Sequence, residues 1–228
     1  MDLRRHLKSV VKKLDASVRS SAAEALARIE DEIEISEAAF QEALGDSRLE
    51  PLLLADIAWL VGLARLRSVS PTLEKLVSEE TPEALLWETT KSLASLGQGA
   101  EVMRQLTLTA EDPEKQKIGV YGLGALRDQE AVELLENILL DPRAPVFLRA
   151  QSAEALGYIQ EMKSVPSLLR ASHDAAPELR FWSVFALGQL ADPRARQRLA
   201  EIAENDHEMV KGWWEVSREA QEALKQIP

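Results

Sequence analysis

Cysteine is absent from the 228 residues, and histidine occurs only as His6, His173 and His207. The chain can therefore form no disulfide, present no thiol nucleophile and build no cysteine-based zinc or iron–sulfur site. Three histidines leave little room for a histidine-rich metal site, and we expect no metal or other cofactor. Aromatic residues make up 5% of the chain against 46% hydrophobic residues in all. This alanine- and leucine-rich composition favours helix over sheet.

Basic charge and long apolar runs are also scarce. The formal net charge is −11 and the sequence pI is about 4.9, whereas a general nucleic-acid binder needs a basic face to neutralise phosphates. No run approaches 18 uncharged apolar residues, and the N-terminal stretch lacks the apolar region and cleavage site of a signal peptide. We expect no general nucleic-acid binding, no membrane span and a cytoplasmic location.

A seven-residue pattern recurs along the chain. It reads small or branched, any residue, small, leucine, small, any residue, aliphatic, and its clear copies lie at 23–29, 120–126, 153–159 and 184–190. Weaker copies give further leucines, and successive leucines lie 30 to 37 residues apart. Such a period predicts stacked supersecondary units. The repeated leucines are Leu26, Leu60, Leu93, Leu123, Leu156, Leu187 and Leu224.

Each unit is predicted to contain two helices. In the clearest one, Pro145 lies near the start of a first helix at 146–160, and a second helix begins near 164–166. Gly157 and Gly188 fall inside first helices, where glycine costs up to about 1 kcal/mol against alanine, so we expect close approach of a neighbouring helix there. The other pairs are expected at 20–29 with 36–44, 52–66 with 71–78, 84–96 with 100–109, 114–126 with 130–140, and 179–190 with 193–204.

No flexible linker interrupts this series, so the sequence predicts one domain over residues 1–228. Its expected fold is an all-α, right-handed solenoid of about six helix pairs. Terminal capping helices are expected at 1–14 and 210–227, because a stack of repeats needs polar end faces for solubility. The first of these is basic and amphipathic, a pattern that also fits a helix lying on a membrane surface.

Two segments carry a family resemblance. The run 148–159 closely resembles the PBS-lyase-type HEAT-like repeat, and so do residues 179–188 followed by Ala-Asp-Pro-Arg-Ala at 191–195. The similarity is strong over residues 115–204 and fades toward the N-terminus. It implies a HEAT-type solenoid. The same repeat occurs in scaffolds, bilin lyase subunits, phycobilisome-degradation factors and two groups of enzymes, so the fold alone selects no activity.

The two enzyme groups can be tested against the residues. Deoxyhypusine hydroxylases hold a di-iron centre through several His-Glu pairs that follow the Leu/Val-Arg of the repeat, where this chain has Ala150-Gln151 and Phe181-Trp182. The only His-Glu pair, His207-Glu208, fits a solvated loop or a single ligand pair, and one pair cannot complete such a site. The related alkylpurine DNA glycosylases use a strongly basic groove, which a chain of net charge −11 matches poorly.

The leading hypothesis is therefore a protein–protein interaction scaffold without catalytic activity. The alternative, implied by the resemblance, is a bilin-lyase-like or phycobilisome-processing factor that handles a chromophore or a chromophorylated protein, which leaves lyase-like activity open.

Candidate binding residues come from outward positions on the second helices. Lys163, Arg170, Arg194 and Arg198 are expected to form one basic patch, either a solvated face or a site for a partner with an acidic surface. Trp213 and Trp214 are expected within the last helix. They either cap the stack or form a hot spot for a protein partner.

Overall fold

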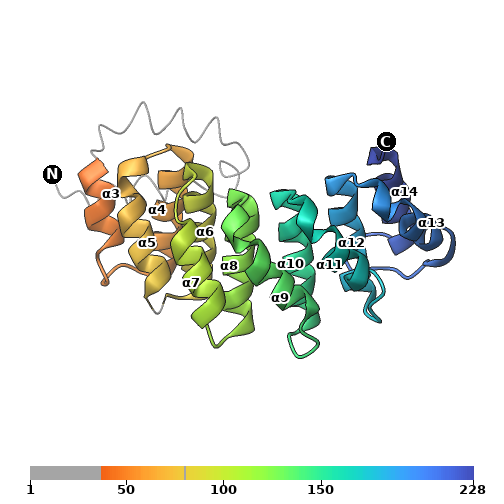
Figure 1. The fold of residues 1–228 in the computed structure, drawn as a ribbon. Coiled ribbons are helices and arrows are strands. Elements are labelled where there is room, and N and C mark those ends of the chain that lie inside the picture. Colours follow the sequence, from red (N-terminus) through yellow and green to blue (C-terminus); the bar gives the residue numbers. More distant parts are fainter. Residues whose placement is uncertain (1–36, 80) are drawn as a thin grey trace. The chain divides into compact units, whose positions relative to one another are not determined.

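The computed structural model describes residues 37–79 and 81–228 (Figure 1). These residues form twelve α-helices and four short 3-10 helices; they contain no β-strand, and Met209 and Glu215 form one isolated bridge. The predicted all-α fold of HEAT-type helix pairs is confirmed. The predicted helices at 1–14 and 20–29, and with them Leu26, lie outside the described residues. The chain divides into two compact units, residues 1–106 and 107–228, and the single domain stays a prediction.

The described part of the first unit is built around the pair α4 and α6, which pack on each other. A Cβ added to Gly62 of α4 would lie 2.9 Å from the Cα of Ser92, so the two helices touch backbone to backbone. The Ser92 hydroxyl donates to the carbonyl of Ala58 at 2.7 Å, and Leu60 and Leu93 are fully buried. The helices here are α3 (Glu37–Leu44), α4 (Pro51–Leu63), α5 (Ser70–Ser78), α6 (Glu83–Leu96) and α7 (Ala100–Thr109), which runs past the unit boundary.

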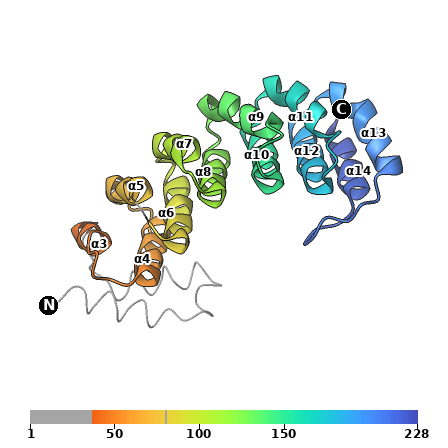
Figure 2. The ribbon, with the colours of Figure 1, turned by 90° about the horizontal axis from the view of Figure 1, so that it is seen from below.

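The second unit contains two layers of helices, which Figure 2 shows as two rows. We call them the A layer, α8, α10, α12 and α14, and the B layer, α9, α11 and α13. Neighbouring A-layer helices pack on one another, and each B-layer helix packs on the A-layer helix that follows it in sequence. The bounds are α8 Pro113–Leu126, α9 Val132–Leu140, α10 Val146–Ile159, α11 Val165–Ala171, α12 Pro177–Leu190, α13 Arg196–Asn205 and α14 Val216–Gln226.

Glycine sets the spacing of the A layer. A Cβ on Gly157 of α10 would lie 2.9 Å from the Cα of Ala186 on α12, and Gly188 faces Ala223 on α14 in the same way. The expected close approach at both glycines is confirmed. Each of these glycines directly follows a repeated leucine, and the alanine that it faces directly precedes the next repeated leucine. The repeat register therefore extends to α14. The repeated leucines Leu123, Leu156 and Leu187 are fully buried.

The predicted start of the last helix, at residue 210, is wrong. Residues 210–215 form a turn, with Gly212 at a φ of 86° and the backbone amide of Trp213 donating to the carbonyl of Val210 at 2.9 Å. The turn interrupts the helical hydrogen bonding, so α14 starts only at Val216. Trp213 and Trp214 therefore lie on a loop and not on a helix as predicted. The other described helices lie within three residues of their predicted bounds.

Candidate partner-binding surface

The exposed face of the A layer carries a recurring stripe of side chains. In α10 the stripe consists of positions 147, 151, 154 and 158, and in α12 of positions 178, 182, 185 and 189. This four–three–four spacing places the members of each set on one helix face. The aromatic members are Phe147, Tyr158, Trp182 and Phe185. The A layer thus presents aromatic rings from successive repeats on one side of the unit.

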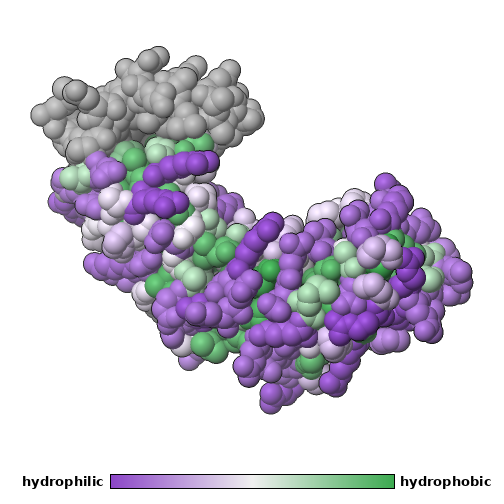
Figure 3. Space-filling view, turned by 45° about the horizontal axis from the view of Figure 1, so that its top comes forward, coloured by the Kyte–Doolittle hydropathy of each residue, from purple (hydrophilic) through white to green (hydrophobic). Residues whose placement is uncertain are grey.

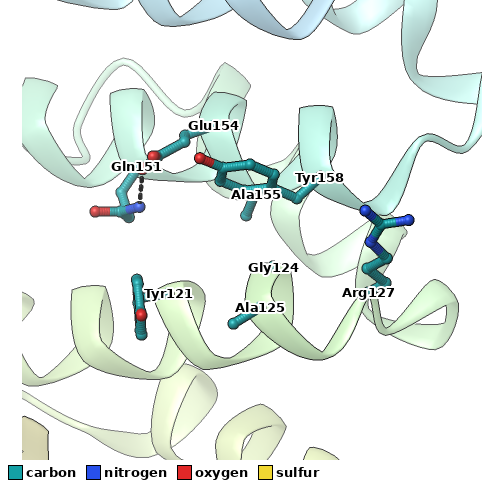
Figure 4. Close-up of a pocket in the computed structure, with 8 residues that line it drawn as sticks. All are labelled: Tyr121, Gly124, Ala125, Arg127, Gln151, Glu154, Ala155 and Tyr158. Atoms are coloured by element: carbon teal, nitrogen blue, oxygen red, sulfur yellow. Dashed lines mark hydrogen bonds between the residues drawn. The ribbon is translucent and has the colours of Figure 1, made fainter. Parts of the chain in front are cut away.

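A pocket of about 280 Å³ lies between α8 and α10 (Figure 4). Its floor is the close contact between Gly124 and Ala155, where the missing Cβ lets the helices meet. In Figure 4, Glu154 and Arg127 lie toward opposite ends, with Tyr158 between them and Tyr121 across on α8. The remaining lining residues are Ala125 and Gln151. The pocket therefore combines aromatic walls with one acidic and one basic end.

Glu154 is the acidic group of this pocket. Burial raises its pKa, while hydrogen bonds from Gln151 and Tyr158 and the charge of Lys117 act in the opposite direction. The pKa of Tyr158 is also raised, first by burial and then by the Glu154 charge. A carboxyl with a raised pKa is one that the protein solvates incompletely. An added cationic or hydrogen-bonding partner would stabilise its ionised form.

A second pocket of about 190 Å³ adjoins the first. Gln151 and Glu154 line both pockets, so the two adjoin at these side chains, and we call the pair of pockets the aromatic groove. The second pocket adds a second carboxylate and three aromatic side chains. Its further lining residues are Lys117, Phe147, Ala150, Glu178, Trp182 and Trp213.

The tryptophans of the groove belong to a cluster of rings in edge-to-face contact. The ring centroids of Tyr158 and Phe185 lie 5.6 Å apart, those of Phe185 and Trp182 5.5 Å, and those of Trp182 and Trp213 5.1 Å. Phe181 is buried beneath them and contacts both Trp213 and Trp214. Such contacts add to burial energy and fix ring orientation. The cluster holds the 210–215 turn against α12.

The two adjacent tryptophans have different surroundings. The Trp214 indole donates to a carboxylate oxygen of Glu219 at 2.9 Å, and the guanidinium of Arg218 lies 5.1 Å from its ring centroid. Trp213 is 47% exposed and lines the groove. Trp214 is thus tied to α14, as a capping residue would be, whereas Trp213 is available to a partner.

The predicted basic patch lies on α11 and α13 of the B layer, at Arg170 and Arg198, and on the 3-10 helices that precede them, at Lys163 and Arg194; we count these 3-10 helices with the B layer. Arg194 approaches the carbonyl of Met162 at 3.4 Å, next to Lys163, and Arg198 donates to the carbonyl of Ser172 at 2.7 Å. The structure thus brings the cations onto neighbouring segments. Two of them, however, already have acidic partners: Arg194 pairs with Asp192 at 2.6 Å and Arg198 with Glu201 at 3.4 Å. Lys163 and Arg170 are exposed.

His207, the histidine of the single His-Glu pair, lies on an exposed loop. Its Nδ1 is 3.4 Å from an oxygen of Glu215 and 3.3 Å from the Ser217 hydroxyl. Among residues 37–79 and 81–228, no group of three or more histidine, aspartate or glutamate side chains could hold a metal ion. In the same described part of the chain, no helix is both long and apolar enough to cross a membrane.

Sequence reasoning missed most of the aromatic groove. It assigned no binding role to Trp182, Tyr121, Phe147, Glu154 or Tyr158. The signal that could have found them is the four–three–four stripe, which stands out once the buried leucine register is fixed. Attention to charge on the second helices directed the prediction to the B layer instead.

Family models match the repeats in this unit. Residues 117–141 match the PBS lyase HEAT-like repeat, and residues 147–225 match HEAT repeats. No curated protein sequence matches the chain significantly.

The chain resembles a number of solved structures, among them the following two. The complex of CpcE and CpcF of phycocyanin lyase from Nostoc sp. PCC7120 matches with a TM-score of 0.49 and 16% identity, over 97% of this chain and 94% of the other. Human deoxyhypusine hydroxylase in complex with glycerol matches with a TM-score of 0.38 and 18% identity, over 98% and 96%. Together with the repeat register, the family models identify HEAT-type repeats at residues 117–141 and 147–225, the first of them of the PBS lyase HEAT-like type that the sequence resembles.

Proposed function

We propose that the chain is a protein-binding scaffold that takes a segment of another protein into the aromatic groove. One observation carries the proposal: two adjoining pockets and the aromatic rings that line them, of which Tyr158 and Trp213 are exposed, lie on a single face. Tryptophan and tyrosine are enriched at the hot spots of protein interfaces. On the face seen in Figure 3, hydrophilic residues cover most of the surface and hydrophobic residues show in small groups.

Repeat geometry supports this proposal. Stacked helix pairs give a long surface on which equivalent positions of successive repeats line up. Positions 151 and 154 of α10 and their equivalents 182 and 185 of α12 are such positions. An extended partner segment can therefore contact several repeats at once. The cations of the B layer, two of which hold carboxylates of this chain, have less free charge for a partner.

The test is an affinity pull-down from the native host at two salt concentrations with three forms of the full chain. The first is the wild type, the second carries Trp182→Ala with Trp213→Ala, and the third carries Lys163→Glu with Arg170→Glu. We expect the partner to be retained by the third form and lost by the second, with circular dichroism showing that each form is folded. Loss of the partner from the third form alone would contradict the proposal.

The alternative function, handling of a bilin or a chromophorylated protein, has one specific observation in its favour. The segment 117–141, which matches the PBS lyase HEAT-like repeat, supplies half of the first pocket's lining: Tyr121, Gly124, Ala125 and Arg127. Arg127 could pair with a bilin propionate. Mixing the protein with phycocyanobilin tests this idea: a spectral shift that Arg127→Gln reduces would support it, and an unchanged spectrum would exclude it.

A further inference from the structure

We propose that the aromatic groove receives a lysine or arginine side chain of the partner segment, between the rings of Trp182 and Trp213 and the carboxylates of Glu154 and Glu178. This inference rests on the proposed function and names the chemistry of the partner. The four groups line one pocket and come from α10, α12 and the turn at 210–215. A long side chain with a cationic end fits such a site, because its methylenes pack on rings while its charge meets the carboxylates.

The carboxylates of the site lack ion-pair partners. Among the described residues, no lysine, arginine or histidine forms an ion pair with Glu178, and Glu154 is held by Gln151 and Tyr158 rather than by a cation. Glu178 and Trp182 are four residues apart on α12, so they lie on the same helix face. A cation that contacts the Trp182 ring is therefore within reach of a carboxylate as well.

The rings of this region already bind cations of the chain itself. The Lys117 ammonium lies 5.5 Å from the ring centroid of Phe147, a residue of the same pocket, and Arg218 lies over Trp214. In the described part of the chain, no such cation lies over Trp182 or Trp213. A cation over a ring face is attracted by the ring quadrupole, most strongly for tryptophan. The rings of Trp182 and Trp213, which contact other rings but no cation of the described chain, are thus the better sites for a cation from outside.

Lys117 is the intramolecular competitor in this account. It lines the pocket, lies 3.6 Å from Glu114 and also attracts Glu154. A partner cation would be repelled by it, so removal of Lys117 should strengthen binding of a cationic ligand and weaken binding of an anionic one. Because the expected change in affinity has opposite signs for cationic and anionic ligands, substitution of Lys117 reports the charge of the ligand directly. Arg127, the other cation of the groove, lines only the first pocket.

The net charge of the chain favours the same class of partner. At −11, the protein attracts basic segments at long range. Attraction by net charge does not select where on the surface a basic segment binds, whereas contacts in the groove do. The salt dependence of binding therefore distinguishes long-range attraction from binding in the groove. Added salt should strongly weaken the long-range attraction and should weaken contact with the rings less.

The experiment measures binding of a fluorescently labelled peptide of alternating arginine and glycine, capped at both ends, to the full chain by anisotropy. A second peptide carries citrulline, the neutral isostere, in place of arginine, and a third carries glutamate. We expect the citrulline peptide to bind about 10-fold more weakly and the glutamate peptide to bind more weakly still. On the protein, Trp182→Ala should weaken binding of the arginine peptide about 10-fold.

Variants that remove one charge and keep a polar side chain make the test independent of folding. Glu154→Gln and Glu178→Gln should each weaken the arginine peptide about 3- to 10-fold, and Lys117→Gln should strengthen it about 2- to 3-fold. Glu204→Gln is the matched control, because it removes the same charge from an exposed site on α13. It should leave affinity unchanged within about 1.5-fold, in the range expected for a screened exposed charge.

The outcomes separate this inference from the proposed function. If Glu204→Gln weakens binding as much as Glu154→Gln, the peptide follows net charge and the inference fails. If Lys117→Gln weakens binding, or the glutamate peptide binds best, the ligand is anionic and the inference also fails. If no peptide binds while the native partner is lost with Trp182→Ala and Trp213→Ala, the groove binds a protein but not through a cation.

Discussion

The A and B layers of residues 107–228 share one repeat and one core but differ in their exposed chemistry. The A layer presents tryptophan, tyrosine and phenylalanine rings beside half-buried carboxyls. The B layer presents arginines, two of which hold Asp192 and Glu201 of the same chain. The difference teaches that a cluster of like charges at outward positions indicates a binding site only if those charges lack partners within the protein.

The largest expected contrast concerns two arginines with different burial. Arg180 of α12 is buried and donates two hydrogen bonds to Asp206, at 2.6 and 3.0 Å. Arg180→Ala would leave a poorly solvated carboxylate and should cost about 3–5 kcal/mol of unfolding free energy in urea denaturation. Arg194→Ala should cost less, because the Arg194 side chain is 57% exposed and water can take the place of its guanidinium beside Asp192. Similar losses for the two variants would erase the contrast between the layers.

A second prediction tests the shared core. Leu156 of α10 and Leu168 of α11 are both fully buried. Truncation of either to alanine should cost about 2–5 kcal/mol through lost burial and the cavity that remains. Chemical denaturation measures both. A loss below about 1 kcal/mol for Leu156→Ala would mean that the leucine register does not define the core.

A third prediction concerns the spacing of the A layer. Gly157→Ala places a methyl group 2.9 Å from the Cα of Ala186, so the helices must separate. Although alanine favours helix by up to about 1 kcal/mol, overpacking of this kind typically costs about 1–3 kcal/mol. We expect a net loss of stability in thermal or urea unfolding. Gly188→Ala should behave alike against Ala223, and a gain in stability for both would refute the close contact.

Much of the fold could be predicted from the sequence because buried leucines repeat with a clear period. Leu123, Leu156 and Leu187 set the register of the helices and of the glycines between them. The turn at 210–215 could not be predicted in this way, because it depends on Gly212 and on tryptophan packing against Phe181. The groove was missed for a related reason: it depends on which helix faces remain uncovered, and periodicity does not report this.

The smallest expected effect is a difference in titration between the layers. Burial raises the pKa of Glu154 in the groove, whereas the hydrogen bonds and charge of Arg194 lower the pKa of Asp192. The Glu154 contribution to stability is therefore present at low pH and is lost as pH rises from about 4.5 through its folded pKa. That of Asp192 is present above about 3.8 and is lost as pH falls through its folded pKa.

Carboxyl NMR titration checks these directions residue by residue. Glu154 should titrate above the ordinary glutamate range and Asp192 below the ordinary aspartate range. Arg194→Gln should return Asp192 toward its ordinary value and leave Glu154 unchanged. Equal midpoint shifts at both carboxyls after this substitution would show that long-range charge, rather than local contact, sets the difference.

The most direct test of the A layer as the binding face is NMR mapping of the arginine–glycine peptide on the full chain. The account predicts that the indole signals of Trp182 and Trp213 and the backbone amide of Glu154 shift together, with one affinity. The amides of Lys163 and Arg170 on the B layer should stay in place. Shifts concentrated at Lys163 and Arg170, with the two indoles unmoved, would contradict the account.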